Sequence, residues 1–227
     1  MPSNSRCIGL IGGLGIGATI LYYQELAKAH AARGRTLDLC ILHADVARVL
    51  DLIKAGDVAA LTDYLASFAD RLRAAGAEMV ALTGVAPHFC APELARRAPV
   101  PLIDLVAEIG AAVRRTGYRR VSLFGTRFAM ESRLFGRLAD IEVVLPQPEE
   151  LTQIHDAYVQ VVARGAGDAA TRTLVTEIAQ RQMARDRVEA IIFAGTELSL
   201  LFLEAPPSFA HIDGTKVHID AIMRAVD

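Results

Sequence analysis

The chain has 227 residues, of which 52% are hydrophobic, so it is long enough for one large domain or two small ones and too apolar to be disordered. Its net charge of −2, from 24 Lys and Arg against 26 Asp and Glu, argues against nucleic acid or an anionic membrane as the main partner. The sequence has no apolar segment long enough for a membrane span and no signal-peptide pattern at its N-terminus, so we expect a cytoplasmic protein.

Short apolar segments alternate with helical patterns in the first half of the chain, which is typical of a parallel sheet covered by helices. The strands predicted for this half span residues 7–12, 37–45, 78–83 and 100–104. The helices predicted between and after them run from the first glycine turn to about residue 32, and over 59–75, 90–97 and 105–117.

The same pattern restarts at about residue 118, which indicates a second unit similar to the first. Its predicted strands cover 118–127, 141–146 and 188–197, and its predicted helices cover 128–139, 149–185 with a glycine break, 199–205 and the C-terminal end. We therefore predict an α/β fold of two similar half-domains with parallel sheets, facing each other across a cleft. The first comprises residues 1–105 completed by 208–227, and the second comprises 106–207.

Polar turns follow the strands of both predicted half-domains, at the sheet edge where ligands bind in open α/β folds. The first turn carries Gly13 and Gly15 and leads into a helix that contains Thr19. Such a turn permits close approach of an anion to backbone N–H groups, so a carboxylate is one interpretation. A dinucleotide fingerprint with Asp45 on a ribose is a second interpretation, and a purely structural turn is a third.

Three polar residues mark the two turns predicted in the second half-domain. Thr126 and Thr196 each stand at the start of a helix, where a hydroxyl either caps the helix or binds a carboxylate. Glu197 complements the helix dipole, and if buried it would carry a proton or bind a substrate amine. We hypothesise that a carboxylate binds between the turns at Gly13, Thr126 and Thr196.

Three further residues of the first half-domain or the last helix have side chains suited to acid–base chemistry. His88 stands at a helix start, where an imidazole serves either as an acid–base group or as a capping, packed side chain. Cys90 follows it and is more consistent with a buried thiol, and His218 lies on the last helix.

Six segments in this order resemble the aspartate/glutamate racemase family of cofactor-independent amino-acid racemases. They cover residues 8–26, 71–88, 121–132, 141–150, 191–201 and 212–221, and so nearly the whole chain. The resemblance implies two similar α/β domains, a homodimer, no cofactor or metal, and catalysis by two cysteines that exchange the α-proton on opposite faces of the substrate.

Neither of the two cysteines that the resemblance implies is present. The first normally opens a Cys-Asn-Thr-x-His motif, and its position here is Gly84, or Thr83 if the turn differs by one residue. Where that motif has Asn and Thr, this chain has Val85 and Ala86. The second cysteine belongs to Gly-Cys-Thr-Glu, where this chain has Gly195 before a retained Thr-Glu pair. Glycine carries no proton and a hydroxyl is a weak base, so the ordinary two-thiol reaction is not expected.

We therefore expect a racemase-superfamily protein that binds or acts on a small carboxylate or amino acid, and an isomerase-like enzyme is the first interpretation. The residues expected to act in catalysis are Thr83, His88 and Glu197. The residues expected to bind the ligand are Gly13, Gly15, Thr19, Gly84, Val85, Thr126, Gly195 and Thr196. A catalytically silent carboxylate-binding relative and a dinucleotide-dependent enzyme are the alternatives. Nucleic acid and membrane are not expected as partners.

Overall fold

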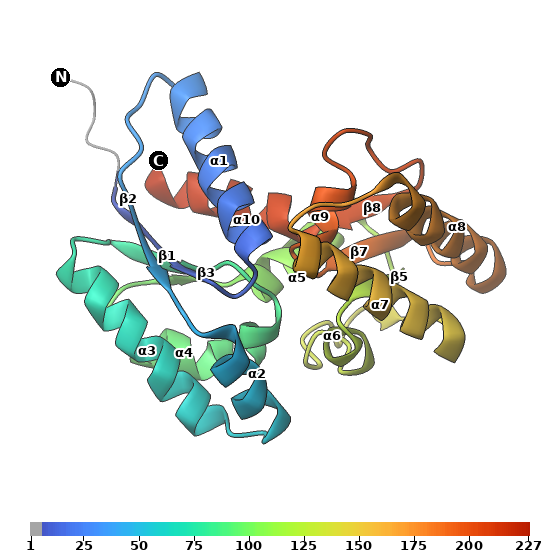
Figure 1. Ribbon diagram of the computed structural model, residues 1–227, viewed down its shortest axis with the longest axis horizontal. Coiled ribbons are helices and arrows are strands. Elements are labelled where there is room, and N and C mark those ends of the chain that lie inside the picture. The colour runs from blue at the N-terminus through green and yellow to red at the C-terminus, as the bar shows by residue number, and fades with distance from the viewer. Residues whose placement is uncertain (1–5) are drawn as a thin grey trace. The chain divides into compact units, whose positions relative to one another are not determined.

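The chain folds into two compact units in the computed structural model, which describes residues 6–227 (Figure 1). The first unit holds the described residues up to Leu105 together with His218–Asp227, and the second holds Val106–Val217. Each unit contains one four-stranded parallel sheet with helices, which confirms the predicted α/β class. Residues 1–5, on which part of the signal-peptide interpretation rests, lie outside the described residues.

The first sheet has the strand order β2-β1-β3-β4. The elements of this unit are β1 (Ile8–Gly12), α1 (Ile16–Ala32), β2 (Leu39–His43), α2 (Val46–Lys54), α3 (Val58–Ala74), β3 (Met79–Leu82), the 3₁₀ helix η1 (Ala86–Cys90), α4 (Ala91–Arg97) and β4 (Leu102–Ile103). The end of α10 (Gly214–Val226) completes the unit, and α5 (Leu105–Thr116) leads into the second.

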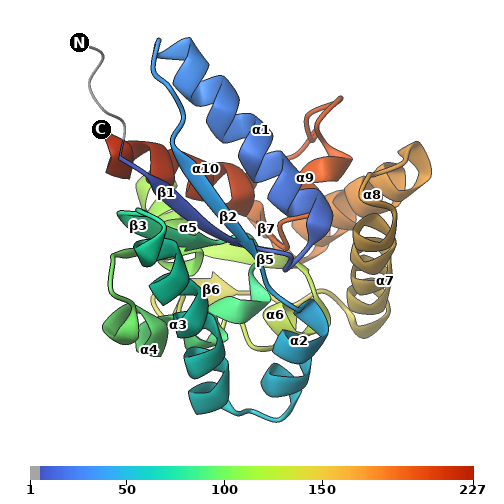
Figure 2. The ribbon, with the colours of Figure 1, turned by 60° about the vertical axis from the view of Figure 1, so that its left-hand side comes forward.

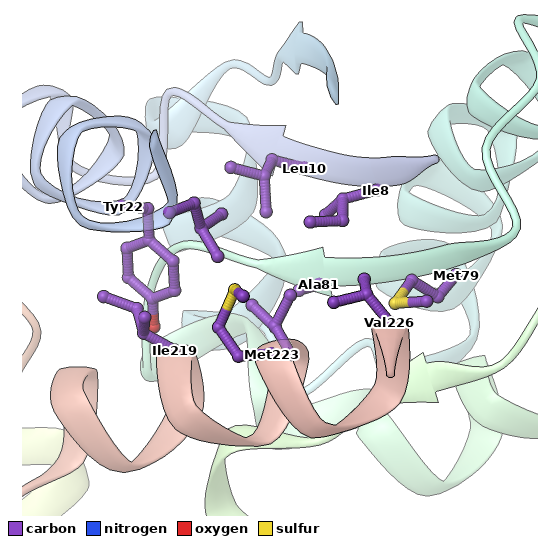
Figure 3. Packing of buried hydrophobic residues seen from close by; sticks show 10 residues of the cluster. Ile8, Leu10, Tyr22, Met79, Ala81, Ile219, Met223 and Val226 are labelled. Atoms are coloured by element: carbon purple, nitrogen blue, oxygen red, sulfur yellow. The ribbon is translucent and has the colours of Figure 1, made fainter. Parts of the chain in front are cut away.

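The central strands β1 and β3 are buried along their whole length, as expected for parallel strands that are covered on both faces. Figure 3 shows one face of these strands packed against α10 and α1. The fully or nearly fully buried side chains of this cluster are Ile8, Leu10, Tyr22, Leu26, Met79, Ala81, Ile219, Ile222, Met223 and Val226. The chain's last turns therefore belong to the core of the first unit.

Helix α3 covers the opposite face of the first sheet, as Figures 1 and 2 show. The approach is close because β1 has a glycine there: a Cβ atom on Gly9 would lie 3.0 Å from the Ala77 Cβ and 3.2 Å from the Leu72 Cβ. The sheet is thereby held between α3 on one face and α1 with α10 on the other. This fixes the carboxyl ends of β1 and β3, where the polar turns begin.

The second sheet has the order β6-β5-β7-β8, which repeats the topology of the first. Its elements are β5 (Arg120–Gly125), α6 (Arg127–Glu131), β6 (Glu142–Val143), α7 (Pro148–Arg164), α8 (Ala169–Asp186), β7 (Ala190–Ala194), α9 (Leu198–Leu201) and β8 (His211–Asp213). Because β8 pairs with β7, residues 208–217 extend the second unit, and the predicted return to the first unit at residue 208 is wrong. The return begins at His218.

Three predicted elements differ from those observed. Helix α2 was not predicted; it begins after Asp45, whose carboxylate accepts hydrogen bonds from the Ala47 and Arg48 N–H groups. The helix predicted over 128–139 ends at Glu131, because the chain turns left-handed over residues 133–136, all of which have positive φ. The helix predicted over 199–205 is only one turn long.

Candidate functional site

The polar turns lie at the points where the strand order reverses in each sheet. In the first sheet β1 and β3 are neighbours and their connections lead to opposite sides, and β5 and β7 have the same relation in the second. The carboxyl end of such a pair is where ligands bind in doubly wound folds. The turns after β1 and β3, and those after β5 and β7, are therefore the candidate half-sites of the two units.

Two threonine hydroxyls join the turns of the first half-site. The Thr19 Oγ1 accepts the Gly13 N–H at 3.2 Å, donates to the Gly15 carbonyl oxygen at 2.9 Å, and lies 2.9 Å from the Thr83 Oγ1. Either hydroxyl of this pair can be the donor, because the Thr83 Oγ1 also lies within donating distance of a carbonyl oxygen, that of Ile11 at 3.4 Å. Gly13 has φ 78°, and a Cβ there would lie 2.5 Å from the Ala44 carbonyl oxygen, so this turn requires glycine.

Within the described residues, no side chain caps the start of α1 by a hydrogen bond. Its N-cap is Gly15, which offers no capping side chain, and the first turn of the helix contains no acidic residue. A 17-residue helix carries partial positive charge at this end, which favours a bound anion. Gly13, Gly15 and Thr19, the residues expected to bind ligand in this turn, thus form one continuous local structure.

His88 is fully buried and fixed through both ring nitrogens. Its Nδ1 lies 2.8 Å from the Gly84 carbonyl oxygen, and its Nε2 accepts the Leu105 N–H at 3.1 Å. The bond to Leu105 assigns the proton to Nδ1, because Nε2 must be unprotonated to accept. The ring therefore ties the turn after β3 to the start of α5. Its expected acid–base role stays a prediction.

The other side chains of the first half-site are apolar or inert. Val85 is buried. A Cβ on Gly84 would lie 3.1 Å from the Leu14 Cβ, closer than an ordinary van der Waals contact, so a side chain there requires Leu14 to shift by a few tenths of an ångström. Cys90 is fully buried, and burial raises its thiol pKa to about 11, so it is a protonated thiol near neutral pH. Asp45 caps α2 through its Oδ1.

Thr126 caps α6 in the second half-site. Its Oγ1 accepts the Ala129 N–H at 3.1 Å, which is the capping geometry, and its own proton is left for donation. The Arg127 guanidinium bonds Glu131 at 3.3 Å and the Thr152 hydroxyl at 2.9 Å, while its backbone N–H donates to the His155 Nδ1 at 3.3 Å. The turn after β5 is thereby attached to α7.

Gly195 is packed between a backbone and an aromatic ring. A Cβ atom at this position would lie 2.5 Å from the Tyr158 Cε2, 2.8 Å from its Cδ2 and 3.2 Å from the Gly125 Cα. Carbon atoms that are not bonded to each other do not approach so closely, so residue 195 has no room for a side chain while the Tyr158 ring stays in place. The position that the family resemblance gives to a cysteine is therefore filled by tyrosine from α7.

A buried carboxyl stands next to this glycine. Glu197 is 1% exposed, and its Oε2 accepts hydrogen bonds from the Tyr158 hydroxyl at 2.5 Å and the Thr196 hydroxyl at 2.9 Å. Its Oε1 is buried and has no hydrogen-bond partner among residues 6–227. Burial raises the pKa of Glu197, although the two hydroxyl donors act in the opposite direction. Burial, and then the neighbouring Glu197, raise the pKa of Tyr158 well above its usual value.

The structure thus brings Thr196 and Glu197 together with a residue that was not predicted. Tyr158 lies on α7, 39 residues before Glu197, and no local pattern marks it. The weak signal in the sequence is its spacing from His155, because residues three apart on a helix share a face. Both contact the turns at the carboxyl ends of β5 and β7. No group of three or more potential metal ligands gathers anywhere within residues 6–227.

Comparisons with known proteins agree with the fold. The family model described as Asp/Glu/Hydantoin racemase matches residues 11–222. A candidate Asp/Glu racemase from Yersinia pestis has a similar structure, with TM-score 0.83 and 24% identity over 98% of this chain and 100% of that one. An aspartate racemase homologue from Pyrococcus horikoshii matches with TM-score 0.80 and 21% identity over 97% and 99% of the two chains.

A more distant structure is that of a glutamate racemase from Francisella tularensis in complex with D-glutamate. It matches with TM-score 0.65 and 15% identity, over 98% of this chain and 81% of that one. At these identities the likeness to the solved structures concerns the fold. In the part of the chain from Arg6 onward, no helix has the length and apolar character needed to cross a membrane.

Proposed function

The chain belongs to the Asp/Glu/hydantoin racemase family, and from this premise we propose that it is an isomerase, independent of pyridoxal phosphate, that acts on a small amino acid or related carboxylate. Its chemistry is the removal and return of the proton on the carbon next to the carboxylate. This chain does so without the thiol pair, since Gly84 and Gly195 have no side chain.

The observation that carries the proposal is the buried Glu197. A carboxyl whose pKa is raised by burial is a better base than an exposed one, and such groups are typical of active sites. Its Oε1 has no partner within the described residues, so a ligand can supply one. The carboxyl also stands at the end of β7, the strand beside the reversal of order in the second sheet.

A carboxylate is the ligand class that the turns favour. The uncapped start of α1 offers N–H groups and a favourable dipole, and the Thr126 hydroxyl keeps a proton for donation. The Thr196 proton is used on Glu197, so we assign Thr196 to holding that carboxyl and not to direct carboxylate binding. Val85 and Ala86 make the first half-site less polar than the resemblance implies.

Catalysis in the first half-site is proposed to be weak. The Thr83 hydroxyl, although close to Thr19, is a poor base at neutral pH. His88 has both nitrogens on backbone groups, so we assign it to holding the turn between Gly84 and Leu105. Positioned acid–base groups each contribute roughly 10²–10⁴-fold, so a chain with one effective group is expected to be much slower than an enzyme with two thiols.

Solvent deuterium incorporation tests the proposal. L- and D-aspartate and L- and D-glutamate are incubated with the protein in deuterated water, and loss of the α-proton signal is followed by NMR. We expect slow exchange of at least one of the four by wild type and none by Glu197→Gln. Absence of exchange with all four would contradict the proposed activity for these amino acids.

A variant with both glycines changed to cysteine tests whether the thiol pair restores fast exchange. Because Tyr158 fills the space at residue 195, the test compares Gly84→Cys/Gly195→Cys with the same protein carrying Tyr158→Ala. We expect faster exchange only where the ring is removed. Fast exchange by wild type itself, at the rate of the cysteine variants, would refute the view that the missing thiols limit this protein.

A catalytically silent carboxylate-binding protein is the second candidate, because neither glycine position carries a proton. Binding without exchange distinguishes it: the four amino acids would raise the melting temperature and exchange no proton. In the dinucleotide interpretation Asp45 would bind a ribose while its Oδ1 caps α2. A homodimer in the cytoplasm completes the proposal by family likeness, and sedimentation equilibrium measures its assembly state.

A further inference from the structure

We propose that Tyr158 is the positioning residue of the second half-site: its ring occupies the space of a side chain at residue 195, and its hydroxyl orients Glu197 so that Oε1 exchanges the proton with the ligand. This inference rests on the proposed function and deepens it, because it names the atom that acts and the residue that holds it. The proposed role of Tyr158 has a steric part, the packing of its ring against Gly195, and a hydrogen-bonding part, the donation of its hydroxyl to Glu197.

The steric part concerns Gly195 and Tyr158 as a matched pair. The space next to Gly195 is filled by two ring atoms, Cε2 and Cδ2, at 2.5 Å and 2.8 Å from an ideal Cβ. A side chain at residue 195 and an aromatic ring at residue 158 therefore exclude each other. The Gly125 Cα lies 3.2 Å from the same ideal Cβ, which is also closer than an ordinary van der Waals contact.

The hydrogen-bonding part concerns the two oxygens of Glu197. Oε2 accepts from Tyr158 and Thr196, whereas Oε1 is buried with no partner in the described part of the chain. Buried polar atoms without partners are rare and are often found where a ligand or a reaction uses them. Two donors on one oxygen fix the carboxyl plane and leave the other oxygen for the proton.

Charged groups on α8 and β8, which pack against α9 and β7, have hydrogen-bond partners of their own. Arg172 of α8 donates to the Leu201 carbonyl oxygen, and Asp213 of β8 accepts from the Ser199 hydroxyl and the Lys216 N–H. On α7, the Nδ1 of His155 accepts the Arg127 N–H. The side chains that donate to the Glu197 carboxyl are two neutral hydroxyls.

The step itself needs no co-reactant. The bond between the α-carbon and its hydrogen breaks, the proton moves to the Glu197 Oε1, and the electron pair stays on the carbon next to the ligand's carboxylate. The new O–H bond exchanges its proton with solvent, and Oε1 returns the solvent-derived proton to the same face of the carbon, which is the exchange reaction. Isomerisation requires that the returning proton reach the opposite face. The Tyr158 O–H bond stays intact throughout.

The first test follows the titration of Glu197 by NMR of carboxyl-labelled glutamate, with Glu197→Gln used to assign the signal. Tyr158→Phe keeps the ring and removes one donor that favours the ionised carboxyl, so we expect the titration midpoint to move to higher pH. Thr196→Ala should move it in the same direction, and Tyr23→Phe, on an exposed side chain of α1, should not. An unchanged midpoint in Tyr158→Phe would overturn the hydrogen-bonding part.

The second test enlarges residue 195 and shrinks residue 158, separately and together. Gly195→Ala and Tyr158→Ala should each lower the melting temperature, and the double variant should lose less than the sum of the two losses, because the smaller residue 158 leaves room for the new methyl group. Additive losses would overturn the steric part.

The rate of solvent deuterium exchange tests whether Tyr158 contributes to the proposed reaction. We expect Tyr158→Phe to slow solvent deuterium exchange by about tenfold, because the variant loses one hydrogen bond to a charged group. A rate equal to that of wild type would show that Tyr158 only fills space. If wild type exchanges no proton, the proposed activity fails, while the titration and the size variants still decide whether Tyr158 holds Glu197.

Discussion

At the residue scale, His218 shows how a titratable side chain serves structure. It is fully buried in the first unit, where its Nδ1 accepts the Tyr22 hydroxyl at 2.7 Å and its Nε2 donates to the Ile103 carbonyl oxygen at 2.8 Å. Burial, and next the proximity of His88, lower the pKa of His218 to about 3. The ring is therefore neutral near neutral pH, and it joins α10 to α1 and β4.

This depressed pKa makes the first unit sensitive to acid. Between about pH 6.5 and 3 the unfolded chain binds a proton at His218 and the folded chain does not, so stability falls as pH falls, by up to about 1.4 kcal/mol per pH unit. His218→Gln keeps one donor and one acceptor but does not titrate. We expect urea unfolding of wild type to weaken more steeply than that of the variant between pH 6.5 and 4. Parallel pH profiles would contradict the assignment.

At the element scale, the sequence predicts strands better than short helices. Apolar runs such as Ile191–Ala194 between turns predict β7 and place Thr196 and Glu197 at its end, as observed. Helix α2 is missed because nine residues carry little periodic signal, and the cap at Asp45 is its main sign. Tyr158 is missed for a different reason: its contact with Glu197 joins residues 39 apart, and local patterns do not report such contacts.

The end of α8 gives a prediction at this scale. Its C-cap is Arg187, in the left-handed conformation with φ 54° and ψ 37°, where glycine is the usual residue. Side chains in that conformation cost roughly 1–2 kcal/mol, so Arg187→Gly should stabilise the protein by about 1 kcal/mol. Ala184→Gly, on an exposed position inside the same helix, should destabilise it by about the same amount. Chemical denaturation of both variants measures the pair, and a loss of stability in Arg187→Gly would count against the assigned conformation.

At the scale of the whole molecule, the chain builds one topology twice and returns to its first unit at the end. The restart of the pattern at residue 118 predicts the second sheet, and the shared strand order is consistent with that reading. The position of residues 208–217 was not predictable, because the three-residue strand β8 is too short to show a period. It joins the second sheet through its backbone pairing with β7.

The two cores should therefore respond separately to the loss of a buried side chain. Ile222, on α10, is fully buried against β1 and β3, so Ile222→Ala should cost about 2–5 kcal/mol in the first unit although it lies near the C-terminal end. Ile178, on α8, is equally buried in the second unit and serves as the matched variant. Hydrogen exchange followed by mass spectrometry should show faster exchange of β1 and β3 amides in Ile222→Ala, and of β5 and β7 amides in Ile178→Ala. Equal acceleration of all four strands in both variants would mean that the units unfold together, and that the last helix stabilises the whole chain and not the first unit alone.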